Sequence, residues 1–104
     1  MSAPSEKTIL VTGGRGFIGG AVAAALGQAG FAARVGVRKP SAPDQISCDL
    51  DQGGELGAAV AGAKLVVHTA YGDVSAMPRQ CANLLAAMSD AGVDSLVYFS
   101  SIAV

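Results

Sequence analysis

The chain has 104 residues, of which 51% are hydrophobic and 14% are charged, and this composition excludes an intrinsically disordered protein. Seven Lys or Arg and eight Asp or Glu residues give a net charge of −1, so we expect neither nucleic acid nor a membrane surface as a partner. No apolar run approaches the roughly 20 residues of a membrane-spanning helix. Residues 1–7 lack the basic start and apolar core of a signal peptide, so we expect a cytoplasmic domain that handles a small molecule.

The chain contains two cysteines, Cys48 and Cys81, which lie too far apart in the sequence for a metal-binding or redox pair of the CxxC kind. Two cysteines in a domain this apolar do not form a disulfide framework. We therefore expect two free thiols and no metal site.

A glycine-rich segment joins the first predicted strand to the first predicted helix. Residues 1–7 are polar and are interpreted as a flexible tail, and residues 8–12 form a short β-rich apolar run. Gly13, Gly16 and Gly19 follow at intervals of three, and residues 17–29 carry apolar side chains at helical spacing as far as Gly30. Such glycines form a tight turn, let the backbone approach a pyrophosphate and let the helix pack closely on the sheet. The alternative is a structural turn that only lets the helix cross the strand. The predicted strand before the glycines and the predicted helix after them make this alternative less favoured.

The rest of the chain alternates predicted strands with predicted helices. We predict strands at residues 32–37, 45–48, 64–68 and 96–99 and helices at 55–61 and 79–91. The last helix should bury one apolar face and end at Gly92; that face comprises Cys81, Leu84, Leu85, Met88 and Ala91. Alternation of this kind predicts an α/β fold with a doubly wound (Rossmann) parallel sheet, in the order 3-2-1-4-5. Residues 8–104 then form one domain, whose ligand lies outside the carboxyl ends of the first and fourth strands.

The segment TGGRGFIG, residues 12–19, resembles the TGxxGxxG fingerprint of the extended short-chain dehydrogenase/reductase family, which includes nucleotide-sugar epimerases and dehydratases. Residues 83–88, 91–93 and 96–101 resemble the fourth helix and fifth strand of that family. The resemblance implies that the chain is the NAD(P)-binding portion of an oxidoreductase, epimerase or dehydratase. It also implies that the following residues contact the dinucleotide: Gly13, Arg15, Gly16, Phe17, Ile18 and Gly19.

Arg38 bears on the choice between NAD and NADP. An acidic residue about 20 positions past the glycines binds the ribose 2′-hydroxyl of NAD, whereas an arginine accommodates the 2′-phosphate of NADP. Arg38 stands where the resemblance places the family's aspartate, and Arg15 lies within the glycine loop. The sequence therefore favours NADP over NAD, with the alternative that Arg15, Arg38 and Lys39 are only solvated loop charges.

Two further segments at predicted strand ends resemble cofactor contacts of the family. Asp49 and Leu50 resemble its Asp-Leu pair at the adenine ring, although a surface turn would also accommodate an aspartate. Residues 68–71, HTAY, resemble its His-x-Ala-Ala segment, so Thr69 and Ala70 are expected to border the cofactor's ribose, with Tyr71 beside them. His68 has no Asp or Cys partner at a useful spacing, and we expect a packed, hydrogen-bonded histidine rather than a catalytic one.

Ser101 aligns with the serine that orients the substrate hydroxyl in the family, and it is the one catalytic candidate. The family's Tyr-x-x-x-Lys pair is missing, because Ser75 and Ile102 stand four residues after Tyr71 and Tyr98. The family's Asn-x-x-Gly-Thr segment before the fourth helix is also missing.

The chain ends in an apolar segment just after the fifth predicted strand. We therefore expect a fold truncated after that strand, as the amino-terminal part of a longer enzyme acting on a nucleotide sugar or a similar hydroxy or carbonyl substrate. The alternative is a stand-alone dinucleotide-binding or interaction module without catalysis, which could cover its open sheet edge by forming a homodimer.

Overall fold

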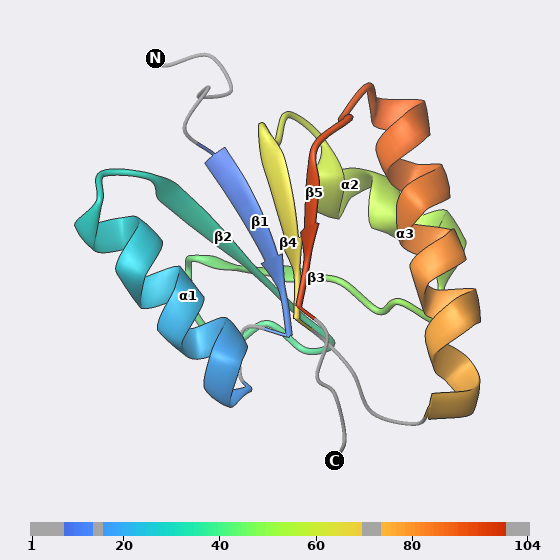
Figure 1. Cartoon of the computed structure of the whole chain (residues 1–104), viewed down its shortest axis with the longest axis horizontal. Coiled ribbons are helices and arrows are strands. Elements are labelled where there is room, and N and C mark those ends of the chain that lie inside the picture. Colours follow the sequence, from blue (N-terminus) through green and yellow to red (C-terminus); the bar gives the residue numbers. More distant parts are fainter. Residues whose placement is uncertain (1–7, 14–15, 70–73, 100–104) are drawn as a thin grey trace.

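The computed structural model describes residues 8–13, 16–69 and 74–99, and within them a parallel five-stranded sheet lies between helices (Figure 1). The strand order is β3-β2-β1-β4-β5, which confirms the predicted doubly wound fold. The helices and strands are β1 Thr8–Thr12, α1 Phe17–Gln28, β2 Ala32–Val37, β3 Gln45–Ser47, α2 Leu56–Val60, β4 Leu65–His68, α3 Met77–Ala91 and β5 Leu96–Tyr98. Two 3-10 turns, η1 Gly53–Glu55 and η2 Val74–Ala76, precede α2 and α3.

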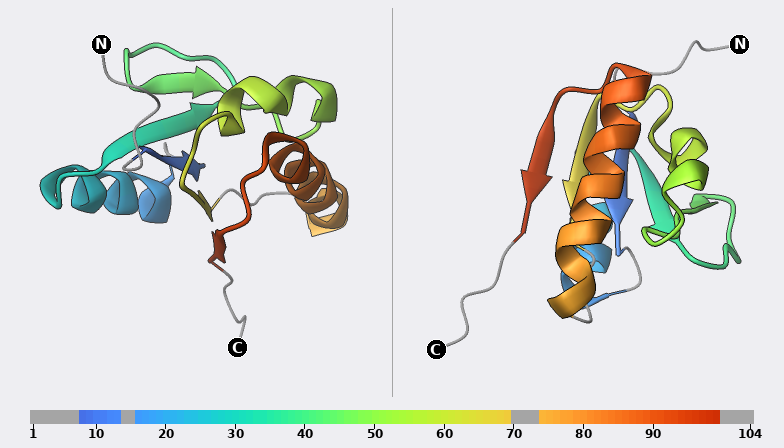
Figure 2. Two further views of the ribbon diagram at one scale, coloured as in Figure 1. Left: turned by 90° about the horizontal axis from the view of Figure 1, so that it is seen from above. Right: turned by 90° about the vertical axis from the view of Figure 1, so that its right-hand side faces the viewer.

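The helices cover the two faces of the sheet unequally. Helix α1 lies on one face, whereas α2 and α3 lie on the other (Figure 2). The carboxyl ends of β1 and β4 are adjacent at the lower edge of the sheet in Figure 1, and α1 and α3 begin at that edge. The residues that follow these strands are therefore brought together, as the predicted order requires.

Alternate residues of the central strand β1 pack on opposite faces of the sheet. Ile9 and Val11 pack with Val67 beneath α1, and Leu10 packs into the larger cluster beneath α2 and α3. Leu10 and Val11 are fully buried. Full burial of one such side chain contributes roughly 1.5–3 kcal/mol, so this short strand is a principal source of stability for both layers.

Several element boundaries differ from the predicted ones by one or two residues. Helix α1 ends at Gln28, and Gly30 follows with φ of 92°, which only glycine adopts readily. Helix α3 begins at Met77 rather than at residue 79, because Pro78 occupies its first turn. Backbone N–H groups in the first turn have no partner within the helix, so a proline is tolerated there. Strands β3 and β5 each end one residue earlier than expected.

The buried face of α3 also differs from the predicted one. Leu84 and Met88 are buried, as expected, but Ala87 is the third buried residue of the helix. Leu85 is 48% exposed and Cys81 is only half-buried. The reason is that α3 packs beside α2 as well as on the sheet, which rotates its buried stripe toward Ala87.

Arg34 of β2 forms hydrogen bonds that link the sheet to the end of α2. Its Nη1 donates hydrogen bonds to the carbonyl oxygens of Ala59 at 2.7 Å and Ala61 at 2.8 Å. The last carbonyls of a helix have no hydrogen-bond partner within the helix, so this guanidinium supplies one. Its positive charge also interacts favourably with the negative end of the helix dipole. Within the described ranges, no helix has both the length and the apolar character needed to cross a membrane.

Candidate functional site

The glycine turn between β1 and α1 has the conformation that its spacing predicts. Gly13 has φ of 71°, a left-handed conformation that glycine adopts without strain. The Gly16 N–H donates to the Gly13 carbonyl oxygen at 2.9 Å, and Gly16 is the N-cap of α1. No side chain caps this helix end, and its first turn carries no acidic residue. The first N–H groups of α1 therefore leave a partial positive charge at the carboxyl edge of the sheet.

Gly19 brings α1 into direct contact with the ends of β1 and β4. It is the one buried residue of α1, and a Cβ atom there would overlap the Gly13 carbonyl oxygen. The same Cβ atom would lie 2.7 Å from Thr69 Oγ1, well inside van der Waals contact. Only a residue without a side chain fits, so the third glycine serves the close packing of helix on strand that was predicted.

A buried polar network joins the carboxyl ends of β1 and β4 beneath this turn. Thr12 Oγ1 lies 2.6 Å from His68 Nδ1, and it accepts a hydrogen bond from the Thr69 N–H at 3.1 Å. Thr69 Oγ1 donates to the Thr12 carbonyl oxygen at 2.5 Å. The His68 ring also stacks on Tyr98 with ring centroids 5.2 Å apart. Burial lowers the pKa of His68, so the imidazole stays neutral at neutral pH.

His68 is packed and hydrogen-bonded, as expected. The polar network holds β1, β4 and β5 in register and orients Thr69, which lies at the point where the sheet order reverses. Thr69 is therefore next to the glycine turn. Thr12, which sequence reasoning treated only as part of the fingerprint, is the hub of this network.

Phe17 and Ile18 occupy the first turn of α1. Phe17 is 94% exposed and Ile18 is also exposed. Their role as cofactor contacts stays a prediction.

Arg38 lies directly after β2, at the same edge of the sheet. Its Nη2 atom is 3.6 Å from Asp51 Oδ2, and Arg79 Nη2 donates to Asp51 Oδ1 at 2.7 Å. Gln80 Nε2 adds a longer hydrogen bond to Asp51 Oδ1, at 3.3 Å. The hydrogen bonds from Arg79 and Gln80, and then the charges of Arg79 and Arg38, hold the pKa of Asp51 below its usual value. Asp51, Arg79 and Gln80 were not among the residues predicted from the sequence.

Asp49 and Leu50 follow β3 and lead to Asp51. Asp49 Oδ1 accepts a hydrogen bond from the Asp51 N–H at 3.0 Å, which forms a local turn. Leu50 is buried in the core cluster beneath α2 and α3, and its carbonyl oxygen accepts a hydrogen bond from Asn83 Nδ2 at 2.8 Å. The Leu50 side chain thus packs mainly against the core. The adenine contact assigned to this pair stays a prediction.

Four predicted site residues lie outside the described residues; they are Arg15, Ala70, Tyr71 and Ser101.

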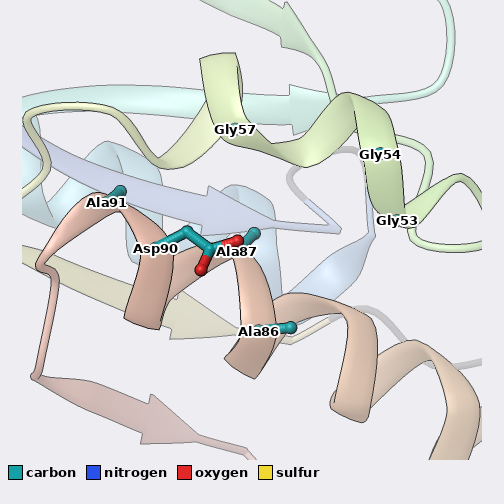
Figure 3. Close-up of a pocket in the computed structure, with 7 residues that line it drawn as sticks. All are labelled: Gly53, Gly54, Gly57, Ala86, Ala87, Asp90 and Ala91. Atoms are coloured by element: carbon teal, nitrogen blue, oxygen red, sulfur yellow. The ribbon is translucent and has the colours of Figure 1, made fainter.

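A pocket of about 380 Å³ lies between α3 and the segment formed by η1 and α2 (Figure 3). Small residues and one carboxylate line it: Gly53, Gly54, Gly57, Ala86, Ala87, Asp90 and Ala91. No residue of the glycine turn is among them. The turn η1 and helix α2 contribute the three glycines, and α3 contributes the alanines and Asp90.

Comparison with known proteins gives one family match. A family model described as NAD(P)H-binding matches residues 13–104, which is most of the chain. No curated protein sequence matches the chain.

Solved structures share the fold. UDP-N-acetylglucosamine 4-epimerase from Bacillus cereus is 22% identical with a TM-score of 0.82, covering 90% of this chain and 35% of that one. Uronate dehydrogenase from Agrobacterium tumefaciens is 25% identical with a TM-score of 0.73, covering 91% and 41%. An NADPH-dependent quinone oxidoreductase from Escherichia coli is 22% identical with a TM-score of 0.76, covering 86% and 35%. The chain thus spans less than half the length of each of these proteins.

Proposed function

Because the chain belongs to the NAD(P)H-binding family, we propose that it forms the cofactor-binding portion of an oxidoreductase, epimerase or dehydratase of the extended short-chain dehydrogenase/reductase kind. The whole protein would transfer hydride between a nicotinamide and a hydroxy or carbonyl group of a nucleotide sugar or similar small substrate. The TGxxGxxG segment and the fold shared with an epimerase and a dehydrogenase support this proposal. We further propose that the protein acts in the cytoplasm and that it can form a homodimer.

The fit of Gly19 against Gly13 and Thr69 is the observation that carries the proposal. A helix held so close to two strand ends presents its first N–H groups at the switch point of the sheet, where an anion is favoured. At Gly13 and Gly16 themselves no Cβ atom hinders the approach of a pyrophosphate to the backbone. These residues fit a dinucleotide.

The remaining cofactor contacts follow from the positions of the residues along the carboxyl edge. Arg38 after β2 lies where the ribose of the adenosine half is bound in this fold, so it would contact a 2′-phosphate, together with Arg15. Asp49 and Leu50 would hold the adenine. Thr69, fixed by its two bonds to Thr12, would border the nicotinamide ribose, with Ala70 and Tyr71.

We propose NADP as the preferred cofactor, on the grounds that Arg38 replaces the acidic residue typical of NAD-dependent proteins. Related structures support both cofactors, since a variant of the uronate dehydrogenase is complexed with NAD and the quinone oxidoreductase with NADPH. When bound, the nicotinamide would supply the hydride chemistry. In this chain the substrate-orienting role would belong to Ser101.

Calorimetric titration of the 104-residue chain with NADPH and with NADH tests the proposal, with the intact mass confirmed on the same sample. We expect saturable binding with NADPH preferred. The variant Arg38→Gln should weaken NADPH binding by about tenfold, the effect of losing one charge-assisted contact, and leave NADH binding within about twofold. Absence of binding to either cofactor by a folded chain of the correct mass would refute the proposal.

A further inference from the structure

Three elements that are distant in sequence bring their charged side chains to one point of the carboxyl edge. Arg38 follows β2, Asp51 follows β3, and Arg79 lies in the first turn of α3. The two arginines contact different oxygens of the same carboxylate, Arg38 at 3.6 Å on Oδ2 and Arg79 at 2.7 Å on Oδ1. Asp51 therefore holds the two guanidinium groups on either side of itself.

This cluster carries a net positive charge and is open to solvent. The side chains of Arg38 and Arg79 are 72% and 60% exposed, whereas that of Asp51 is 33% exposed. The carboxylate remains ionised because hydrogen bonds from Arg79 and Gln80, reinforced by the charges of both arginines, lower the pKa of Asp51. Two positive charges and one negative charge leave one positive charge at the surface, where an anion can reach it.

Arginine suits a phosphate at such a place. A guanidinium carries five N–H donors in a planar fork, and each arginine here contacts Asp51 through its Nη2 atom. The fork can therefore hold the carboxylate on one side and donate to a phosphate oxygen on another. A side chain already fixed by an ion pair also loses less conformational freedom when a ligand binds.

We propose that Arg79 is a second ligand of the 2′-phosphate of NADP(H), beside Arg38, and that Asp51 is the residue that positions both. The proposal rests on the proposed function, because it concerns the same cofactor site. It assigns a role in cofactor choice to the first turn of α3 and to the segment that follows β3. Sequence spacing did not single out either segment for that role.

The test is the variant Arg79→Gln, with affinities for NADPH and NADH measured by calorimetry. We expect a loss of about tenfold for NADPH and less than about twofold for NADH, since only the former carries the phosphate. Binding of 2′,5′-ADP and of 5′-AMP provides a second readout, and only 2′,5′-ADP should bind more weakly to the variant. Lys64→Gln is the matched control, because it removes the same charge from an exposed residue that precedes β4, at the opposite edge of the sheet.

A purely structural role for Arg79, as a tether between α3 and Asp51, gives a different result. Arg79→Gln would then lower the stability of the chain and weaken NADPH and NADH equally, and this would overturn the proposal. Arg79→Lys separates the two roles further. It keeps the charge and can pair with Asp51 but lacks the fork, so its NADPH affinity should lie between those of the wild type and Arg79→Gln.

The positioning role of Asp51 has its own test. Asp51→Asn keeps the shape of the side chain and removes the charge that holds Arg79. In that background Arg79→Gln should cost much less NADPH affinity than in the wild type, since Arg79 is no longer fixed. An equal cost in both backgrounds would show that Asp51 does not position Arg79.

Failure of this inference can be distinguished from failure of the proposed function. If the wild type binds NADPH and NADH but Arg79→Gln leaves their ratio unchanged, the inference is wrong and the cofactor site stands. If the folded wild type binds neither cofactor, both are wrong.

Discussion

The side chains of Thr12 and His68 meet across the pair of strands β1 and β4, with Oγ1 and Nδ1 2.6 Å apart. Both side chains are buried. Thr12 Oγ1 also accepts a hydrogen bond from the Thr69 N–H, so one hydroxyl links the backbone after β4 to the His68 ring. The tautomer of the neutral imidazole determines whether Oγ1 or Nδ1 donates in the Thr12–His68 pair.

This arrangement predicts that the chain loses stability in mild acid. Burial lowers the pKa of His68 in the folded state below the ordinary value of 6.5, which applies to the unfolded chain. The unfolded state therefore binds the proton more readily. The stabilisation is complete above about pH 6.5 and is lost as the pH falls through the folded-state pKa.

Urea unfolding at pH 7.5 and at pH 5.5 measures this effect. The chain has one histidine, so His68→Leu removes the imidazole that titrates in this interval. The wild type should lose more of its free energy of unfolding between the two pH values than the variant does. Equal losses would show that His68 is not the group responsible.

Gly19→Ala should destabilise the fold and weaken cofactor binding. Its Cβ atom would overlap the Gly13 carbonyl oxygen and press on Thr69 Oγ1, so α1 would have to move away from the strand ends. We expect the free energy of unfolding to fall by about 1–3 kcal/mol, as in other overpacked sites.

Gly27→Ala is the control within the same helix. Apart from its chain neighbours and the backbone of its own helix, a Cβ atom there meets nothing within 4 Å, and alanine favours a helix by roughly 0.5–1 kcal/mol over glycine. This variant should be as stable as the wild type or more stable. A similar loss in both variants would refute the packing role of Gly19.

Arg34→Met should lower the free energy of unfolding by about 1–3 kcal/mol, since it removes two hydrogen bonds from a charged group to the end of α2. Lys64→Met, which changes an exposed lysine in the same way, should change stability by less than about 0.5 kcal/mol. Denaturant unfolding of the two variants side by side gives the comparison. A loss no larger for Arg34→Met than for Lys64→Met would mean that water replaces the guanidinium at these carbonyls.

The two thiols should differ in reactivity. Burial, with the nearby charge of Asp49, raises the pKa of Cys48 to about 11, whereas Cys81 is half-buried. With iodoacetamide at pH 8, peptide mass mapping should find Cys81 alkylated first and Cys48 protected until urea is added. Because the folded-state pKa of Cys48 lies above the ordinary value of 9.0, its thiol also stabilises the fold below about pH 9, and this stabilisation is lost toward pH 11. Equal alkylation rates in the folded chain would contradict the burial of Cys48.

The fold and the glycine turn could be predicted because their signals are local. Gly13, Gly16 and Gly19 act through backbone conformation and missing Cβ atoms, so their spacing alone indicates what the turn does. The strand order follows from the alternation of apolar runs with helical ones. These features need no knowledge of side-chain contacts.

The charged cluster could not be predicted in the same way. Asp51 and Arg79 are 28 residues apart, and only the sheet topology brings the end of β3 to the start of α3. The sequence also predicts too late a start for α3, because Pro78 is typical of a loop but here stands in the first turn of the helix. The burial of Ala87 in place of Leu85 depends on α2, whose short sequence gives no indication of how it packs against α3.

The central place of β1 has a consequence for the order of folding. Thr8 pairs with Ala32 after a short connection, whereas Ile9 pairs with Leu65, more than fifty residues away in the chain. Closing the longer loop costs more chain entropy, so β1, α1 and β2 can associate before β4 docks on the other side of β1. In pulse-labelling hydrogen exchange we expect amides of β2 to become protected earlier than those of β4. The polar network of Thr12 and His68 would then form last, and the edge proposed to bind the cofactor would be the last part of the sheet to fold.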